Sequence, residues 1–596
     1  FKTSKVIFTG SQSRPIERLD RDEQSELKKQ ANQILAGKAK WYGWKTVDIR
    51  FPYDWQFNPF TKQRAAIHGQ HWSEISEPHP TGDIKDIWEQ SRFEWAVVLA
   101  QGWLVFGHQK YLDGLNLQLT DWMENNPINS GTQWMCGQET SIRLLNFLQA
   151  LALLNEKPND TTLEFIAAHI QRVSYGLSYA IGQNNNHGTS ESVCLAVAGA
   201  YLEKYSPPGS PNITLGASAK KQGIKWSNER CSKLFFEDGG FSQYSISYHR
   251  LALETLVLSL EWSKRLDCQK LAAPLLKNTV QRAYNWLIEV TDPSTGDAPN
   301  LGANDGANPY RQLPSAGYRD FRPTMARCAL ALGAPIESHL EKIARNLKAL
   351  KVGEGGDLQT ASKKKPSNIW VAKDFSYAKL TSTSGKFSAF LRGSNFRFRP
   401  AHSDFGHVDV WFQHKPILID CGTFRYTSNT NDPVLDLAAA QSHNCLLIND
   451  RDPMIRLSRF LFGDWLDGPL SQVNERTLEV RRKFESKGLH TRALSIDDEQ
   501  VCIRDKLIGA SGRITIRWHL AGTDWILRSP NEISNGVIIL KCETQATEPS
   551  FSLDTAKASL HYAKTNDIQV LTISFPMPDD GTALITTTLQ ALNNSE

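Results

Sequence analysis

Three groups of residues have side chains that could do chemistry together. The first is the run QNNNHGTSE at residues 183–191, which brings amides and an imidazole together just before a predicted helix. Thr189 or Ser190 is the expected N-cap of that helix. Backbone N–H groups and the positive end of the helix dipole would then lie beside Asn186 and His187, which predicts a place to hold a carboxylate or another anion. A polar loop with a good helix cap is the alternative interpretation.

The second group is the segment EDGGFSQYSISYHR at residues 237–250, which leads into another predicted helix. Tyr248 stands directly before His249 and Arg250. Nearby positive charge favours a phenolate, so we expect the pKa of Tyr248 to be lowered. Such a tyrosine can give or take a proton. Alternatively, Tyr248 simply packs with its hydroxyl hydrogen-bonded.

The third group is spread over a longer stretch. His402 follows a strand-like FRFRP segment, Asp420 follows an apolar run, and His443 precedes another. If the intervening strands pair consecutively, these three side chains lie at neighbouring strand ends. Two imidazoles and a carboxylate with an open position suit zinc, whereas ordinary polar residues at strand ends are the alternative.

Helices must position the first two groups. Between about residues 85 and 350 apolar residues recur at three- and four-residue spacing, which predicts a succession of helices. No fixed-length repeat is present, so an irregular ring of helix pairs is expected rather than a solenoid. The predicted segments are Leu19–Ala36, Ile84–Phe106, Glu139–Leu154, Leu163–Ile181, Val193–Tyr205, Arg250–Leu266, Leu275–Val290 and Thr324–Leu332.

Strands must position the third group. Lys351–Ser367 is polar and reads as a linker, and beyond it the apolar period falls to two. Ser534-Asn535-Gly536 carries an Asn-Gly hairpin signal, and Asp497-Asp498-Glu499 marks another turn. An antiparallel β-sandwich is expected. The predicted strands are Phe387–Leu391, Val408–Phe412, Ile417–Ile419, Leu446–Ile448, Thr477–Phe484, Val501–Leu507, Ile514–His519 and Val537–Leu540.

Composition narrows the class of protein. A chain of 596 residues needs more than one domain, and a net charge of +4 gives no argument for nucleic acid. Seventeen Trp offer flat apolar platforms for sugars or simply helical cores. Nine scattered Cys without a CxxC pair favour neither a disulfide framework nor a zinc ribbon. No apolar run is long enough to cross a bilayer, and no signal peptide is visible.

Several ordered pieces of the sequence resemble the heparinase II/III superfamily of polysaccharide lyases. They run from about residue 70 to 455: GDIKDIWEQSRFEW, TQWMCGQETSIR, QNNNH, DGGFSQYSISYH, NLGANDG, RPAHSDFGHVDVWF, LIDCGTFRY and SHNCLLIND. The resemblance implies an incomplete (α/α) toroid followed by an antiparallel β-sandwich, with a cleft between them. We accordingly expect an N-terminal segment at 1–70, a toroid at 71–355 and a sandwich at 356–596. It also implies cleavage of uronic-acid-containing acidic polysaccharides by β-elimination, in a periplasmic or secreted enzyme; the cysteines and the absence of a visible signal peptide leave a cytoplasmic location open.

Residue roles follow from the same resemblance. Asn186 resembles the amide that neutralises the substrate carboxylate, His187 the imidazole beside it, and Tyr248 the catalytic tyrosine. The metal ligands would be His402, Asp420 and His443, holding one structural Zn²⁺ or another divalent ion. Further substrate contacts are expected from Glu139, Tyr244, Arg250, Asn304, Asp305 and His407.

The chain departs from the family pattern at one position. Many members have His-x-His-x-Asp where this chain has Ala401-His402-Ser403-Asp404, preceded by Pro400, so the first, catalytic His is absent. Either His402 or His407 takes its place, or Tyr248 handles both proton transfers with His187. Two other functions stay open: a toroid-type glycoside hydrolase using Glu237, Asp238 or Asp305, and a non-catalytic polysaccharide-binding protein.

Overall fold

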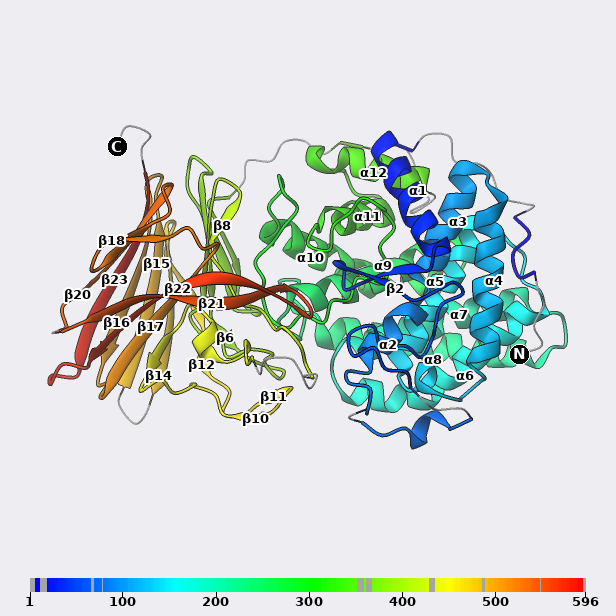
Figure 1. Ribbon diagram of the computed structural model, residues 1–596, viewed down its shortest axis with the longest axis horizontal. Coiled ribbons are helices and arrows are strands. Elements are labelled where there is room, and N and C mark those ends of the chain that lie inside the picture. The colour runs from blue at the N-terminus through cyan, green and yellow to red at the C-terminus, as the bar shows by residue number, and fades with distance from the viewer. Residues whose placement is uncertain are drawn as a thin grey trace.

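The computed structural model describes residues 6–10, 19–65, 69–77, 79–350, 359–360, 367–427, 435–484, 488–546 and 548–592. Helices fill one half of the molecule and strands the other, in the order of the chain (Figure 1). The last helix ends at Ala349 and the next strand begins at Ile369. The predicted linker Lys351–Ser367 and the predicted boundary at 355/356 fall almost wholly outside the described residues.

The helical half is an incomplete toroid built from two layers of helices. Helices α3, α5, α7, α9 and α11 contact one another in succession, and most of them also pack against the helix that follows in the chain. The inner helices α5 and α7 are buried on nearly all sides, which fits their apolar composition. The helices are α1 (Arg21–Leu35), α2 (Lys85–Trp88), α3 (Glu94–Phe106), α4 (Gln109–Asn125), α5 (Gly137–Leu154), α6 (Asp160–Gly182), α7 (Asn186–Tyr205), α8 (Pro211–Leu234), α9 (Ile246–Arg265), α10 (Pro274–Val290), α11 (Arg322–Leu332) and α12 (Glu341–Ala349).

The alternation of inner and outer helices brings polar residues from several helices to the same end of the ring. Because each inner helix is followed by an outer one that returns the chain, successive inner helices start at the same end of the ring. The first turns of α5, α7 and α9 carry Gln138, Asn186 and Tyr248, so this topology gathers those side chains. Close contact between α7 and α8 needs glycine, since a Cβ on Gly223 would lie 2.2 Å from the backbone nitrogen of Ala196.

The predicted helices are present, with one division. The segment Ile84–Phe106 forms α2, a 3₁₀ turn (Glu89–Arg92) and α3 rather than one helix. Phe93 interrupts it with a left-handed backbone (φ 63°) while its side chain is fully buried. The turn places Glu89 and Arg92 at the end of the ring, where a continuous helix would not.

The strand half is an antiparallel β-sandwich. One sheet has the order β13-β14-β15-β16-β23-β20-β19-β18, and the other runs β21-β22-β17-β8-β7-β5-β4-β3 with β9 also pairing with β17. Leu380, Val410, Leu494 and Ile516 belong to the buried apolar cluster of this half. The strands of these sheets are β3 (Ile369–Ala372), β4 (Tyr377–Thr381), β5 (Phe387–Arg392), β7 (Val408–Phe412), β8 (Lys415–Leu418), β9 (Leu446–Ile448), β13 (Leu470–Asn474), β14 (Thr477–Phe484), β15 (Gly488–Ile496), β16 (Gln500–Ile508), β17 (Arg513–Leu520), β18 (Ile526–Ser529), β19 (Glu532–Ser534), β20 (Ile538–Thr544), β21 (Ser550–His561), β22 (Lys564–Pro576) and β23 (Thr582–Ala591).

All eight predicted strands are present; seven agree to within two residues at each end, whereas β20 runs four residues further than predicted, to Thr544. The Asn-Gly signal lies in the turn between β19 and β20, where Gly536 has φ 80°. Short two-stranded pairings complete the structure: β1 (Lys38–Trp41) with β2 (Lys45–Asp48), β10 (Arg456–Ser458) with β11 (Leu461–Phe462), and β6 (Ser394–Asn395) with β12 (Asp467–Gly468).

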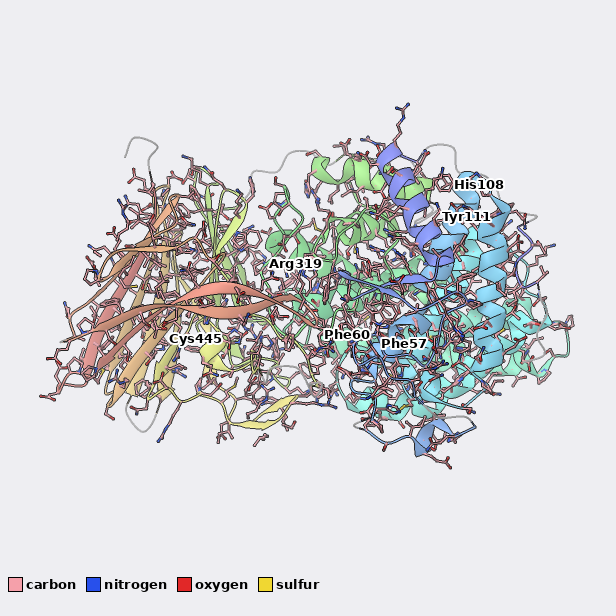
Figure 2. The ribbon with its side chains drawn as sticks, viewed as in Figure 1. Phe57, Phe60, His108, Tyr111, Arg319 and Cys445 are labelled. Carbon is pink, nitrogen blue, oxygen red and sulfur yellow. The ribbon has the colours of Figure 1, made fainter. Side chains whose placement is uncertain are left out.

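Side chains join the two halves directly. The β21–β22 hairpin extends from the sandwich to the helices (red in Figure 1), and the Tyr562 hydroxyl at its tip donates to Asp83 Oδ2 at 2.8 Å. Arg319, labelled at the junction in Figure 2, donates to Asn300 Oδ1, and Asn300 Nδ2 donates to the Ser559 carbonyl. Of the helices in the described residues, none is long and apolar enough to cross a membrane.

Candidate active site

The first turn of α7 holds the amide group predicted to meet an anion. The helix begins at Asn186, with Asn185 as its N-cap accepting from the His187 backbone N–H at 3.0 Å. Our prediction of Thr189 or Ser190 as the N-cap is therefore wrong, because Asn185 caps one turn earlier. Asn186 and His187 lie inside the first turn, where N–H groups and the helix dipole favour negative charge.

Two glutamines hold Asn186 in place. Its side-chain Nδ2 donates to Gln138 Oε1 at 2.8 Å, and its backbone N–H donates to Gln243 Oε1 at 2.8 Å. Gln138 begins α5 and Gln243 precedes α9, so three inner helices meet at this residue. In the sequence, the signal for Gln138 and Gln243 is their position near the starts of predicted helices.

His187 is the accessible member of the pair. About 31% of its side chain is exposed, and its Nδ1 lies 3.9 Å from Glu191 Oε1 one turn further along. Burial lowers the pKa of His187, which makes the imidazole neutral near pH 7. Burial raises the pKa of Glu191 to about 8, so this carboxyl is largely protonated in the folded protein at neutral pH.

Tyr248 lies in the first turn of α9, which Ser245 caps by accepting from the Tyr248 N–H. Its hydroxyl is 2.8 Å from that of Tyr426, a residue of the strand half that sequence reasoning missed. The predicted lowering of its pKa is wrong: burial, and then the negative charge of Asp305, raise the pKa of Tyr248 well above its usual value. His249 and Arg250 are directed elsewhere, and Tyr248 is protonated at neutral pH.

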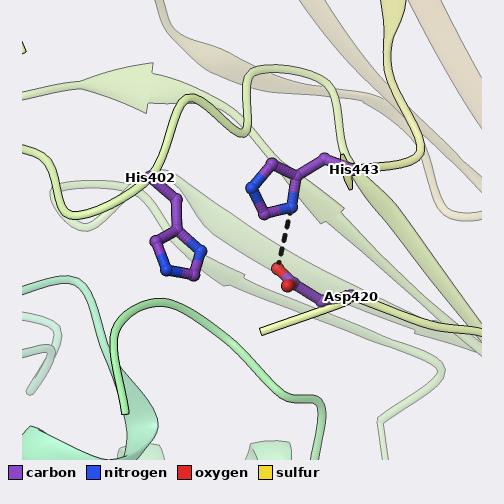
Figure 3. A group of neighbouring side chains, drawn as sticks. All are labelled: His402, Asp420 and His443. Atoms are coloured by element: carbon purple, nitrogen blue, oxygen red, sulfur yellow. Dashed lines mark ion pairs between the residues drawn. The ribbon is translucent and has the colours of Figure 1, made fainter. Parts of the chain in front are cut away.

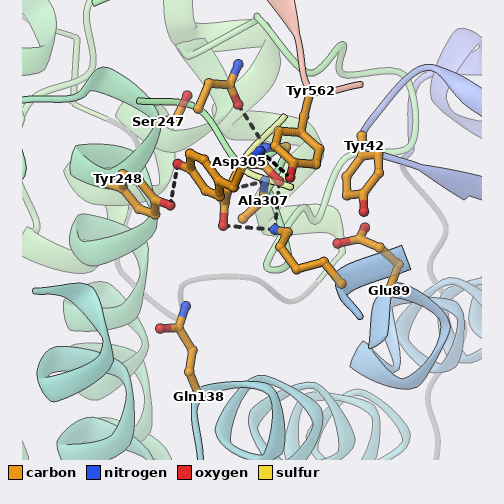
Figure 4. Close-up of polar contacts among 12 residues, drawn as sticks. Tyr42, Glu89, Gln138, Ser247, Tyr248, Asp305, Ala307 and Tyr562 are labelled. Carbon is orange, nitrogen blue, oxygen red and sulfur yellow. Dashed lines mark hydrogen bonds and ion pairs between the residues drawn. The ribbon is translucent and has the colours of Figure 1, made fainter. Parts of the chain in front are cut away.

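A network of buried charges forms the wall opposite Tyr248. Lys85 Nζ donates to Asp305 Oδ2 at 3.1 Å, and Arg92 binds both oxygens of Glu139 at 2.7 Å. Glu89 accepts from the other side of Arg92. Burial would raise the pKa of Asp305 and of Glu139, but the cations paired with them outweigh it and lower both. Figure 4 shows Tyr248 and Gln138 directed towards the same region, with Asp305 beside it.

Several predicted substrate contacts instead bind the protein itself. Arg250 is 1% exposed and donates to the carbonyls of Tyr318 and Ala307. The Tyr244 hydroxyl accepts from the Arg397 backbone N–H at 2.9 Å. Burial and internal hydrogen bonds engage both groups, and their contacts with substrate stay predictions.

His407 is engaged in a similar way, whereas Asn304 uses only its side-chain oxygen, and its Nδ2 has no partner within the described residues. His407 is 1% exposed, with one ring nitrogen 3.2 Å from Asp409 Oδ2 and the other accepting from the Asn444 N–H. Asn304 Oδ1 accepts from the Tyr318 hydroxyl at 2.6 Å. Substrate contacts by His407 and Asn304, and a proton transfer by His407, stay predictions.

The carboxylates proposed for a hydrolase do not form a pair. Glu237 is exposed beside Arg282, Asp238 accepts from the Phe375 N–H across the domain junction, and Asp305 is paired with Lys85. A glycosidase needs two carboxyl groups flanking one bond. Each of these three carboxylates has its own partner in a different part of the protein.

His402, Asp420 and His443 form a compact, buried group (Figure 3). One ligand atom from each lies within 4.8 Å of the others, and His443 Nδ1 is 3.2 Å from Asp420 Oδ2. His402 comes from the loop before β7, Asp420 follows β8, and His443 precedes β9. Because β8 and β9 both pair with β17, strands distant in sequence bring the three together.

The chemistry of this group fits a metal ion. His402 Nδ1 and His443 Nε2 are buried and have no hydrogen-bond partner within the described part of the chain. Buried polar atoms without partners are rare in proteins unless something else binds them. Burial lowers the pKa of His402 to about 4, which keeps the imidazole neutral, as metal ligation requires.

Comparison with solved structures agrees with this architecture. The chain is similar to heparinase III (TM-score 0.69, 17% identity), covering 99% of this chain and 88% of that one. It is also similar to a mutant of the heparan sulfate lyase HepC from Pedobacter heparinus (TM-score 0.60, 17% identity, 97% and 84%) and to a chondroitinase AC lyase (TM-score 0.52, 12% identity, 97% and 82%). No curated protein matches the sequence. At these identities the likeness concerns the fold.

Family models match both halves of the chain. The model described as heparinase II/III N-terminus covers residues 14–321, and the model described as heparinase II/III-like, C-terminal covers residues 364–587. Together they cover most of the toroid and of the sandwich, and every member of the candidate site. The chain therefore belongs to the heparinase II/III family of polysaccharide lyases.

Proposed function

We propose that this protein cleaves a uronic-acid-containing acidic polysaccharide by β-elimination and leaves an unsaturated uronate at the new end. The observation that carries the proposal is the junction of Asn186 and Tyr248. Gln243, five residues before Tyr248, accepts from the Asn186 backbone, so a carboxylate-binding amide and a proton donor share one framework.

Stabilisation of charge is assigned to the first turn of α7. Removal of the C5 proton of a uronate pushes negative charge onto its carboxylate. Asn186 and the positive end of the α7 dipole would favour that charge, and preorganised stabilisation of this kind is usually the largest contribution to rate. The hydrogen bonds from Gln138 and Gln243 keep Asn186 fixed while the charge develops.

Proton transfer is assigned to Tyr248 and His187. Tyr248 is protonated and donates to the departing O4. For a substrate whose C5 proton and O4 lie on one face, Tyr248 would first have to release its hydroxyl proton to solvent; it would then take the C5 proton and pass that same proton to O4, with Tyr426 bonded to its hydroxyl. For a substrate with the two on opposite faces, the neutral and accessible His187 is the base.

His402 then belongs to the metal group and not to proton transfer. We propose that His402, Asp420 and His443 hold one Zn²⁺, since two imidazoles and a carboxylate are a donor set that zinc accepts. The ion would fix the loops around β7, β8 and β9. We also propose a periplasmic or secreted location, where a polymeric substrate would meet the enzyme.

The test is ultraviolet absorbance on adding a panel of uronate polymers. A lyase creates an unsaturated uronate that absorbs, whereas a hydrolase creates only reducing ends and a binding protein neither. Absorbance that rises with wild-type protein and not with Tyr248→Phe supports the proposal. New reducing ends without absorbance would establish hydrolysis instead.

A further inference from the structure

A buried hydroxyl joins the metal group of the sandwich to the toroid. Thr423 lies three residues after Asp420 and is 8% exposed. Its Oγ1 is 3.2 Å from His402 Nε2, and it accepts from the backbone N–H of Asn304 at 3.0 Å. One side chain therefore contacts a member of the metal group on one side and the backbone of the helical half on the other.

The contact with Thr423 leaves the other ring nitrogen of His402 for a metal ion. His402 Nδ1 is buried and has no hydrogen-bond partner in the described part of the chain. In Figure 3, one ring nitrogen of His402 points towards Asp420 and His443, and the other points away from them. A histidine that binds a metal through one ring nitrogen usually donates from the other, which fixes the orientation of the ring. The arrangement fits a His402 that holds the ion through Nδ1 and donates from Nε2 to Thr423.

A second contact presses the same two segments together. Asn300 Nδ2 donates to the Asp420 carbonyl at 3.4 Å and to the Ser559 carbonyl at 3.1 Å. Gly422 has φ 82°, and a Cβ there would lie 2.5 Å from Asn300 Nδ2. Glycine is therefore needed for this close approach. Residues 420–423 of the sandwich thus lie directly against residues 300–304 of the toroid.

The loop that Thr423 contacts leads into the charged wall of the candidate active site. Asn304 is followed by Asp305, which pairs with Lys85 at 3.1 Å. The negative charge of Asp305 is also one of the causes that raise the pKa of Tyr248. A shift of the Asn304 backbone would therefore move the carboxylate that acts on Tyr248.

We infer that Thr423 is a positioning residue that links the metal group to the candidate active site. It orients His402 for the metal ion. Through the Asn304 backbone it also keeps Asp305 beside Tyr248. The inference rests on the proposed metal group, and it does not depend on which polysaccharide is cleaved.

Thr423→Val tests the link to His402, since valine keeps the shape of the side chain and removes the hydroxyl. Loss of a hydrogen bond to a ligating histidine typically lowers metal affinity about 10–100-fold. We expect a decrease of this size in the zinc affinity of Thr423→Val, measured by competition with a chromophoric chelator, and near-normal affinity in Thr423→Ser. Thr587→Val is the matched control: its buried hydroxyl contacts Cys542 in the other sheet, so zinc affinity should not change.

Hydrogen–deuterium exchange tests the link to Asn304. The Asn304 N–H is protected by its bond to Thr423, so deuterium uptake of the segment 300–306 should rise when a chelator removes zinc from the wild type. In Thr423→Val this uptake should be high both with and without zinc. The measurement on the wild type needs no variant to fold.

Three outcomes would overturn the inference. They are wild-type zinc affinity in Thr423→Val, uptake of the segment 300–306 that does not respond to removal of zinc, and a wild-type protein that binds no zinc. None of these measurements depends on lyase activity, so a failure of the proposed elimination would be recognised separately, by the absence of unsaturated uronate.

Discussion

At the scale of single residues, the side chains of the candidate site contact residues that are distant in the sequence, and not their sequence neighbours. His249 and Arg250 follow Tyr248 directly, yet His249 Nε2 contacts the Gly239 carbonyl and Arg250 is buried among carbonyls. The charge that Tyr248 meets is Asp305, 57 residues later in the chain, and its direct partner is Tyr426. The residue type was therefore enough to predict Tyr248 as a candidate, whereas its protonation state is set by residues that the fold brings next to it.

The role of Tyr248 is tested by comparing Tyr248→Phe with Tyr244→Phe. Loss of the Tyr248 hydroxyl removes the proton donor and should lower kcat by about 10²–10⁴-fold. The Tyr244 hydroxyl accepts from the backbone N–H groups of Arg397 and Phe398, so Tyr244→Phe should cost about 1 kcal/mol of stability and leave turnover nearly unchanged. Initial rates of unsaturated uronate formation and melting temperatures decide. An active Tyr248→Phe beside an inactive Tyr244→Phe would transfer the role to Tyr244.

Asn186→Ala tests stabilisation of the growing carboxylate charge. Because that interaction strengthens in the transition state, kcat should fall far more than KM rises. The matched control is Asn184→Ala in the same run, whose side chain accepts from Arg230 on α8 instead. Steady-state kinetics on one uronate polymer give both constants. A change confined to KM would reduce Asn186 to a binding contact.

Glu191 gives the protein a pH dependence of known sign. Its pKa is raised by burial from 4.5 to about 8 on folding, so the unfolded chain loses this proton first. The contribution to stability is complete below pH 4.5 and is lost as pH rises through about 8. Glu191→Gln stays neutral and should remove this part of the decline. Melting temperatures measured across the same pH interval test this, and parallel curves for the two proteins would contradict the shift.

At the scale of elements, apolar periodicity predicted helices and strands whose buried faces are apolar. It missed a strand whose buried face is polar. The strand β15 was not predicted, because His490 and Arg492 lie on its buried face and bind Asp505 of β16. A search for alternating apolar residues does not detect a strand of that kind. The start of α7 was misplaced for a similar reason: the Asn run supplies both the cap and the first turn. Capping by Asn and by Ser or Thr are close in energy, so the tertiary contacts of Asn186 decide between them.

A metal ion bound by His402, Asp420 and His443 would hold three loops of the strand half together. Substitution of one ligand tests this. His443→Ala should lower the metal content, which we expect to be about one zinc per chain, together with the melting temperature. His414→Ala is the control, since His414 lies exposed in the β7–β8 turn and pairs with Asp292 outside the group. Elemental analysis and thermal unfolding of both variants give the answer. Full metal occupancy in His443→Ala would remove that residue from the site.

At the scale of the whole molecule, the candidate site exists only where the two halves meet. Asn186, His187 and Tyr248 come from the toroid, whereas Tyr426 comes from the sandwich. The resemblance of the sequence to the family pointed to both halves and to the metal group. It did not reveal which side chains cross the junction, because such contacts join residues more than a hundred positions apart and leave no local pattern.

One buried ion pair ties that junction to Tyr248. Arg425 Nη1 lies 3.2 Å from Asp86 Oδ2, and Asp86 is fully buried. Arg425 also precedes Tyr426, whose hydroxyl meets that of Tyr248. Burial raises the pKa of Asp86 to about 6 even with Arg425 present, so the carboxylate depends on this cation to be tolerated.

Arg425→Met should therefore weaken both the junction and catalysis. It leaves a buried carboxylate uncompensated, which typically costs about 3–5 kcal/mol, and it frees Tyr426 to move away from Tyr248. Adding Asp86→Asn removes the stranded charge and should recover much of the melting temperature. Activity should recover less, because the position of Tyr426 still lacks its anchor. If Arg425→Met has the melting temperature and turnover of the wild type, the halves are held together without this pair. If the double variant recovers full activity, burial of the charge limits catalysis and the position of Tyr426 does not.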